Sequence, residues 1–149
     1  MLFRSPCSAD LSDKEAVRLW LKSAEQGNAM AQNNLGYFYW SGRGVPKSYK
    51  EALKWYRKAA FEGNANAQSN LGLAYENGQG VVQNYEEAMR WFMMAAEQGH
   101  PTAQLNIGGM HKQGKGVPQN NEEAARWWRK AADQGLEAAR ARLAQLKYF

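Results

Sequence analysis

The segment "GRGVPKS" at residues 42–48 decides the fold, because the chain repeats it as "GQGVVQN" at 78–84 and "GKGVPQN" at 114–120. A glycine-rich segment of this kind resembles a loop that wraps around a phosphate group. Such a loop follows a strand, opens a helix and occurs once, with a lysine in place. Three copies, each lying between two expected helices, favour a turn inside a repeated helical unit.

The repeat has a constant period of 36 residues. Gly27, Gly63, Gly99 and Gly135 follow one another at this spacing. The same spacing relates three further sets of residues: Leu35, Leu71, Ile107 and Leu143; Ala52, Ala88 and Ala124; and Trp55, Trp91 and Trp127. A fixed period of this length is typical of solenoid proteins, which stack one supersecondary unit many times.

Each unit is expected to contain two helices, called here helix A and helix B. In the first helix A, Ala31, Leu35, Phe38 and Tyr39 fall on one face at helical spacing. The expected ranges are 29–41, 65–77 and 101–113 for helix A, 13–26, 49–62, 85–98 and 121–134 for helix B, and 136–147 for a closing helix A.

Capping residues mark the expected helix ends. Ser48, Asn84 and Asn120 precede three of the helices B, and each can accept a hydrogen bond from first-turn N–H groups. A glutamate follows each of them three residues later, which predicts a capping box, as does "SDKE" at 12–15. The glycines after each helix are expected to adopt a positive φ, as is the second glycine of each Gly-x-Gly.

The full pattern of a unit is Ala-x3-Leu-Gly-x2-Tyr, Gly-x-Gly-Val and Ala-x2-Trp-Tyr-x2-Ala-Ala-x2-Gly. It reads "AQNNLGYFYWSGRGV" and "ALKWYRKAAFEG" in the first copy, and "AQSNLGLAYENGQGV" and "AMRWFMMAAEQG" in the second. The third copy, "AQLNIGGMHKQGKGV" and "AARWWRKAADQG", has His111 in place of Tyr39 and Tyr75. This pattern resembles the Sel-1-like repeat, a relative of the tetratricopeptide repeat, over residues 12–147.

The resemblance implies an all-α fold, an α/α superhelix (solenoid) of helix-turn-helix repeats whose concave face is lined by helix A. It also implies work as an adaptor in protein assemblies. The expected organisation is a lead-in at 1–11 followed by a single repeat domain at 12–149. That domain divides into a half-repeat at 12–27, full repeats at 28–63, 64–99 and 100–135, and a closing helix at 136–149.

Few residues of the chain could carry catalysis. The two histidines are His100, at a helix start, and His111, at a position expected to face the core as a hydrogen-bonded residue. Cys7 is the single cysteine, and its role is not assigned. No metal-binding motif and no serine–histidine arrangement is visible. We therefore expect a non-enzymatic protein with no cofactor and no metal site.

Composition limits the partners. The net charge of +5 and pI of about 9.4 favour acidic partners, but there is no block of like charges and no nucleic-acid motif. We expect a protein or peptide partner, no specific nucleic acid, and a monomer. The absence of a long apolar run and of a signal peptide predicts no membrane insertion and a cytoplasmic location. The periplasm or secretion is the alternative if a leader has been removed.

The helix A face opposite the core stripe differs between copies, whereas the core positions do not. Trp40 stands where the other copies have Glu76 and Lys112, and exposed aromatic residues are typical binding anchors. We expect this face to bind a peptide or partner protein. The candidates are Asn33, Tyr37, Trp40, Asn66, Ser69, Leu73, Glu76, Thr102, Leu105, Lys112 and Gln113, together with Met30, Ser41, Asn77 and Gly109.

A basic column recurs on helix B, at Arg18, Lys54, Arg90 and Arg126. It is expected on the convex side, with Glu86–Arg90 and Glu122–Arg126 as i, i+4 ion pairs. Two alternative functions therefore stay open. The chain could be a dedicated inhibitor or immunity-type partner of one protein, or its basic surface could bind a polyanion or an acidic protein.

Overall fold

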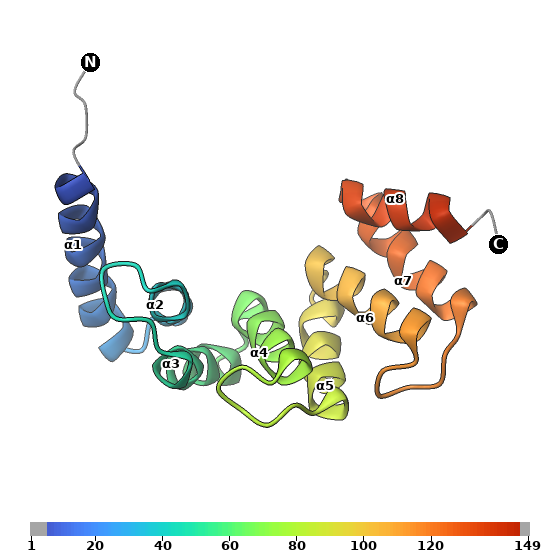
Figure 1. The fold of residues 1–149 in the computed structure, drawn as a ribbon, viewed down its shortest axis with the longest axis horizontal. Coiled ribbons are helices and arrows are strands. Elements are labelled where there is room, and N and C mark those ends of the chain that lie inside the picture. Colours follow the sequence, from blue (N-terminus) through green and yellow to red (C-terminus); the bar gives the residue numbers. More distant parts are fainter. Residues whose placement is uncertain (1–5, 147–149) are drawn as a thin grey trace, which may run out of the picture. The chain divides into compact units, whose positions relative to one another are not determined.

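The structure, a computed structural model, describes residues 6–146 of the chain and the side chains of residues 12–146. This part of the chain contains eight helices and no strand (Figure 1). They are α1 (Pro6–Glu25), α2 (Ala29–Ser41), α3 (Tyr49–Phe61), α4 (Ala65–Asn77), α5 (Tyr85–Glu97), α6 (Pro101–Gln113), α7 (Asn121–Asp133) and α8 (Glu137–Leu146). The fold class is the predicted all-α superhelix of repeated helix pairs.

The predicted repeat is confirmed at the level of individual helices. The three helices A, which are α2, α4 and α6, have the predicted bounds, and the helices B after them end one residue earlier than predicted. The contacts divide the chain into two compact units, Met1–Ala67 and Gln68–Phe149, and each unit is described by itself below.

The prediction for the N-terminal segment was wrong. Helix α1 begins at Pro6, so most of the expected lead-in is helical and Ser12 lies inside the helix instead of capping it. Proline is well tolerated in a first helical turn because its missing N–H group has no partner there in any case. The side chain of Cys7 and the C-terminal residues 147–149, including most of "LKYF", lie outside the described part.

Helices α3, α5 and α7 start as predicted, but the capping box is only half formed. The side chains of Ser48, Asn84 and Asn120 accept hydrogen bonds from the N–H groups of the glutamates three residues later, each at 3.1 Å. The N–H groups of the caps themselves donate to carbonyl oxygens of the preceding helix A. The glutamate side chains are therefore not needed as acceptors. This arrangement joins the two helices of a repeat at the end of the turn.

A glycine inside each helix A admits an aromatic ring from the following helix B. A Cβ atom added at Gly36 would lie 2.6 Å from Cε1 of Tyr56, and one added at Gly108 would overlap the indole of Trp128. Gly72 and Phe92 repeat the arrangement. Because nothing larger than hydrogen fits, these glycines set how closely the two helices of a repeat approach.

Each unit has its own core. In the first, Val17, Leu35 and Trp55 are buried with small alanines, and Phe38 and Val45 pack against them. In the second, Trp128 and the alanines of α7 are buried, and Leu105 and Leu143 pack against them. The three tryptophans that recur at the 36-residue spacing differ in burial. Trp55 is buried, whereas Trp91 and Trp127 are only half-buried, and the deeper positions are those of Tyr56, Phe92 and Trp128.

The Gly-x-Gly turns have the predicted positive φ angles, and the second glycine has an additional role. Gly44 has a φ of 69°, and a Cβ atom there would lie 2.6 Å from the backbone carbonyl of Asp13 in α1. Gly116 lies in the same way against the backbone of Tyr85 in α5. These two turns therefore each pack on the helix B that precedes them in the chain.

A buried glutamine recurs in each helix A, a feature that the sequence analysis did not single out. Nε2 of Gln98 donates to Oε1 of Gln68 at 2.8 Å, and Gln134 donates to Gln104 in the same way at 2.9 Å. The corresponding residue in the first unit is Glu62, whose ionised carboxylate has no hydrogen to donate. Oε1 of Gln32, which is buried, has no hydrogen-bond partner among the described residues.

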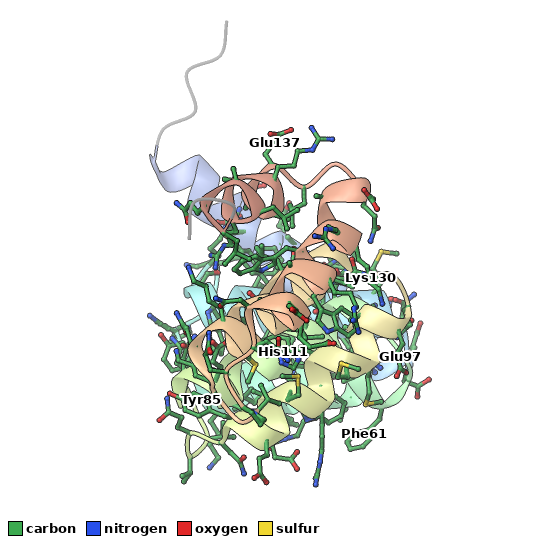
Figure 2. The ribbon with its side chains drawn as sticks, turned by 90° about the vertical axis from the view of Figure 1, so that its right-hand side faces the viewer. Phe61, Tyr85, Glu97, His111, Lys130 and Glu137 are labelled. Atoms are coloured by element: carbon green, nitrogen blue, oxygen red, sulfur yellow. The ribbon has the colours of Figure 1, made fainter. Side chains whose placement is uncertain are left out.

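This difference predicts that Glu62→Gln stabilises the protein. The new amide would supply the missing donor for Gln32, and we expect the free energy of unfolding to rise by about 1 kcal/mol. Glu97→Gln is the matched control, since Glu97 projects from the last turn of α5 into solvent (Figure 2). Urea unfolding of both variants measures the effect. Equal changes would assign it to the lost charge at the helix end.

Candidate functional site

In the first unit, the candidate helix A face is partly exposed and rich in large side chains. Met30 and Tyr37 of α2 are 63% and 50% exposed. Trp40 is half-buried, with its ring centroid 4.5 Å from that of Tyr49 and 6.2 Å from that of Tyr56. Trp40 was expected at the surface, but it covers the start of α3, so Tyr37 and Met30 are the more accessible residues. Asn33 is half-buried on the same helix.

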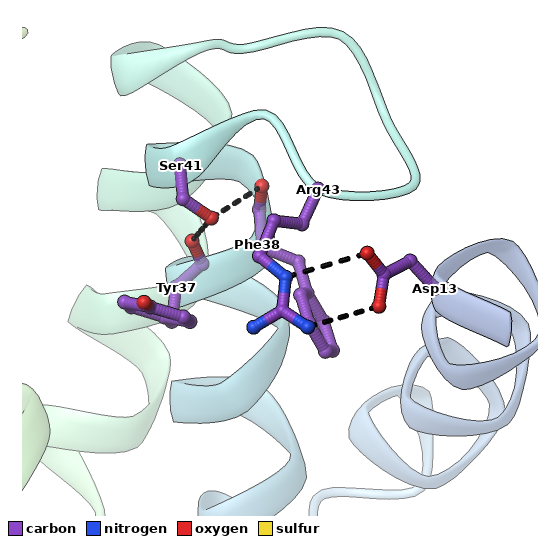
Figure 3. A network of polar contacts seen from close by, with 5 residues as sticks. All are labelled: Asp13, Tyr37, Phe38, Ser41 and Arg43. Atoms are coloured by element: carbon purple, nitrogen blue, oxygen red, sulfur yellow. Dashed lines mark hydrogen bonds and ion pairs between the residues drawn. The ribbon is translucent and has the colours of Figure 1, made fainter. Parts of the chain in front are cut away.

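A polar network fixes the end of this face (Figure 3). Nη2 of Arg43 lies 3.0 Å from Oδ1 of Asp13 in α1, and its Nε lies 3.4 Å from Oδ2. The guanidinium also lies over the Phe38 ring, 5.3 Å from the centroid. Ser41 donates to the carbonyl oxygen of Tyr37 at 2.8 Å. These contacts hold the turn after α2 against α1, so that Tyr37 projects from an ordered helix end.

Farther along the chain the candidate residues have mixed positions. Asn66, Thr102 and Gln113 are exposed, and Leu73, Glu76, Leu105 and Lys112 are half-buried. Ser69 is only 2% exposed, so the prediction that it faces a partner was wrong. Leu105 packs against the core of its unit. Positions 69 and 105 are equivalent in the repeat and lie at the edge of the buried face of helix A. This buried face is therefore wider than the apolar spacing of the sequence indicated.

Burial affects one acidic residue of this face. The half-buried position of Glu76 raises its pKa by disfavouring the charged form, and Lys115 partly opposes this shift.

The second unit contains an open hollow of about 470 Å³ between α6 and α8. Two of the candidate residues, Lys112 and Gln113, line it together with Gly109, and α8 contributes Arg142 and Gln145. The guanidinium of Arg142 lies over the Trp128 ring, 5.8 Å from its centroid. The repeat pattern indicated that the α6 residues share this face, but it did not predict the contribution of α8.

The basic column is exposed as predicted, but its ion pairs differ. Arg90 pairs with Glu87 and Arg126 with Glu123, each at 2.6 Å and at i, i+3 spacing, so the predicted i, i+4 pairs were wrong. The side chains of Glu87 and Glu123 are available for these pairs because the N–H groups of the cap residues donate to carbonyl oxygens of helix A instead. Nζ of Lys54 lies 5.6 Å from the Trp55 ring centroid, and Arg18 is exposed.

The two histidines differ in the hydrogen bonding of their rings. His100 caps α6, because its Nδ1 accepts a hydrogen bond from the N–H group of Ala103 at 3.1 Å. Burial lowers its pKa, which favours the neutral form that this bond requires. His111 is half-buried as expected, and its Nδ1 atom is buried and has no hydrogen-bond partner among the described residues.

The described part of the chain offers no group of three or more His, Cys, Asp or Glu side chains that could hold a metal ion. Likewise, none of the helices described is long and apolar enough to cross a membrane.

Comparison with known families identifies the repeat. The family model described as "Sel1 repeat" matches residues 7–28, 29–64, 65–100 and 101–136. The chain therefore belongs to the Sel1 repeat family. Proteins built from these repeats are generally protein-interaction modules, and the fold is typically a non-enzymatic scaffold. A comparison with curated proteins found no match.

Solved structures show the same fold. The chain is similar to c5321, a protective antigen of uropathogenic Escherichia coli, with 39% identity and a TM-score of 0.86 over 91% of this chain. It is also similar to a Sel1 repeat protein from Oxalobacter formigenes, with 41% identity and a TM-score of 0.82 over 88% of this chain. The chain spans 29% and 52% of those two proteins. Cysteine-rich protein B of Helicobacter pylori, at 23% identity and a TM-score of 0.69, covers 89% of this chain, which in turn covers 95% of it.

Proposed function

We propose that this chain is a protein–protein interaction module that binds a peptide or partner protein through its helix A face. The observation that carries the proposal is the exposure of Met30 and Tyr37 on α2, at repeat positions where the other copies have different residues. Large exposed apolar side chains at positions that the repeat does not need for packing are typical of binding surfaces.

The basic column supports a polyanion-binding function less well. Two of its four cations are paired with glutamates on their own helices, at Arg90 and Arg126. Those pairs reduce the positive charge available to a polyanion, whose affinity depends on the number of cations that contact it. No observation on the described residues favours an inhibitor or immunity-type role over a general adaptor.

Replacing Tyr37 tests the proposal. We expect Tyr37→Ala to reduce partner capture by about tenfold, which corresponds to about 1.4 kcal/mol of binding free energy. The thermal midpoint should change little, because half of the side chain already contacts solvent. The measurement is quantitative affinity purification with the immobilised chain, followed by a binding isotherm for each protein recovered.

Phe61→Ala provides the control. Phe61 is 78% exposed at the end of α3, a helix B, so the substitution removes an aromatic side chain from outside the proposed face. A partner lost equally with both variants would contradict the assignment of the face. A large fall in the thermal midpoint of Tyr37→Ala would show instead that this residue belongs to the core.

A further inference from the structure

The hollow between α6 and α8 exists because one repeat lacks a side chain. Gly109 occupies the position that is Tyr37 in α2 and Leu73 in α4. A Cβ atom at Gly109 would meet only Nη1 of Arg142, at the ordinary contact distance of 3.7 Å. Glycine is unfavourable inside a helix by about 1 kcal/mol relative to alanine. Neither packing nor a positive φ requires it here, in contrast to the neighbouring Gly108.

The side chains around the hollow have a consistent chemistry. Lys112 and Arg142 are basic, Gln113 and Gln145 are amides, and none of the described carboxylates lines the hollow. Within residues 12–146, neither cation forms an ion pair. Glu137 and Arg140, on the same helix as Arg142, pair with each other at 2.9 Å. The hollow therefore combines two available positive charges with amide groups that can both donate and accept hydrogen bonds.

The floor of the hollow is apolar and is held by packing and a hydrogen bond. Trp128 is 1% exposed overall, its Nε1 donates to the carbonyl oxygen of Leu105 at 3.0 Å, and its ring also contacts Gly108. Ala138 and Ala141 of α8 complete the apolar part of the lining. A rigid apolar floor below charged and amide groups is suited to an extended segment that has both small apolar and acidic side chains.

We propose that this hollow binds an acidic peptide segment of a partner protein, with a carboxylate of the segment held by Lys112 and Arg142. The inference rests on the proposed interaction function and assigns it a site and a ligand chemistry. Two cations that have no carboxylate neighbour within residues 12–146 attract a carboxylate, and Gln113 and Gln145 line the same hollow and can bond peptide groups beside it. Filling the position of Gly109 closes the site.

The experiment selects peptides of about twelve random residues, displayed on phage, against the immobilised wild-type chain. The selected peptide is then synthesised with a fluorescent label, together with a counterpart in which Asn and Gln replace Asp and Glu. Fluorescence anisotropy measures the binding of both by wild type, Gly109→Leu, Lys112→Gln and Arg142→Gln. Lys50→Gln is the charge-matched control, since Lys50 is exposed on α3 in the other unit. Circular dichroism checks that each variant stays folded.

The expected result is a selected sequence rich in Asp and Glu whose affinity falls about tenfold in the three hollow variants and stays unchanged in Lys50→Gln. The wild-type chain should bind the neutral counterpart no more tightly than the hollow variants bind the acidic peptide. Peptides without acidic residues, or acidic peptides insensitive to all three variants, would overturn the inference and leave the interaction function standing. Recovery of no peptide would also overturn it.

Discussion

Gly108→Ala is expected to lower the free energy of unfolding by about 3 kcal/mol, near the upper end of the cost of overpacking a core. The added methyl group would overlap the indole ring of Trp128, which is 1% exposed and cannot move outward without breaking its hydrogen bond to Leu105. The gain in helix propensity from glycine to alanine, about 1 kcal/mol, offsets only part of this cost. Urea unfolding followed by circular dichroism measures the change.

The neighbouring residue supplies the control for this prediction. Gly109→Ala places the same methyl group one position along α6, where only Arg142 lies within 4 Å of it. We expect this variant to be more stable than wild type by about 0.5–1 kcal/mol, the ordinary propensity gain. Similar unfolding energies for the two variants would mean that the contact between Gly108 and Trp128 does not limit the approach of α6 and α7.

Gly44→Ala is expected to cost about 3 kcal/mol for two separate reasons. Its φ of 69° lies in the left-handed region, which costs a residue with a Cβ atom about 1–2 kcal/mol. The new Cβ would also lie 2.6 Å from the carbonyl carbon and oxygen of Asp13, and backbone atoms of a helix cannot move aside cheaply. The turn would have to lift from α1, which would weaken the ion pair between Arg43 and Asp13.

Gly63→Ala separates these two reasons. Gly63 also has a positive φ, 93°, but nothing lies within 4 Å of the position that its Cβ would take. We expect this variant to lose only the conformational part, about 1–2 kcal/mol. Thermal and urea unfolding of both variants measures the difference. A loss for Gly63→Ala as large as that for Gly44→Ala would contradict a packing role for the second glycine of the turn.

The sequence allowed the repeat and most helix ends to be predicted because these depend on local chemistry. Ser48, Asn84 and Asn120 act as caps through their own side chains and the three residues that follow, so the signal is contained in a short segment. The glycines with positive φ were predictable for the same reason. At the N-terminus the local signals conflicted, because "SDKE" has the form of a cap but the helix continues through it from Pro6.

Features that depend on pairs of distant residues could not be predicted in this way. The close approach of Gly36 to Tyr56 involves two helices, and helical periodicity carries no information on the distance between them. The burial of Ser69 likewise depends on its neighbours in space. Predicting the hollow at Gly109 would have required knowing that α8 supplies Arg142 and Gln145 to the same lining as Lys112. The sequence therefore indicated which positions vary between copies, but not which of them are accessible together.

The first and third Gly-x-Gly turns each pack on a helix that is synthesised before them. Gly44 contacts α1 and Gly116 contacts α5, so in both cases the surface that receives the turn is made by residues nearer the N-terminus. During synthesis the ribosome releases that surface first, and domains generally fold from the N-terminal side as they emerge. Each of these two turns therefore finds its docking surface already present when it is made, and neither has to wait for a later repeat in order to pack.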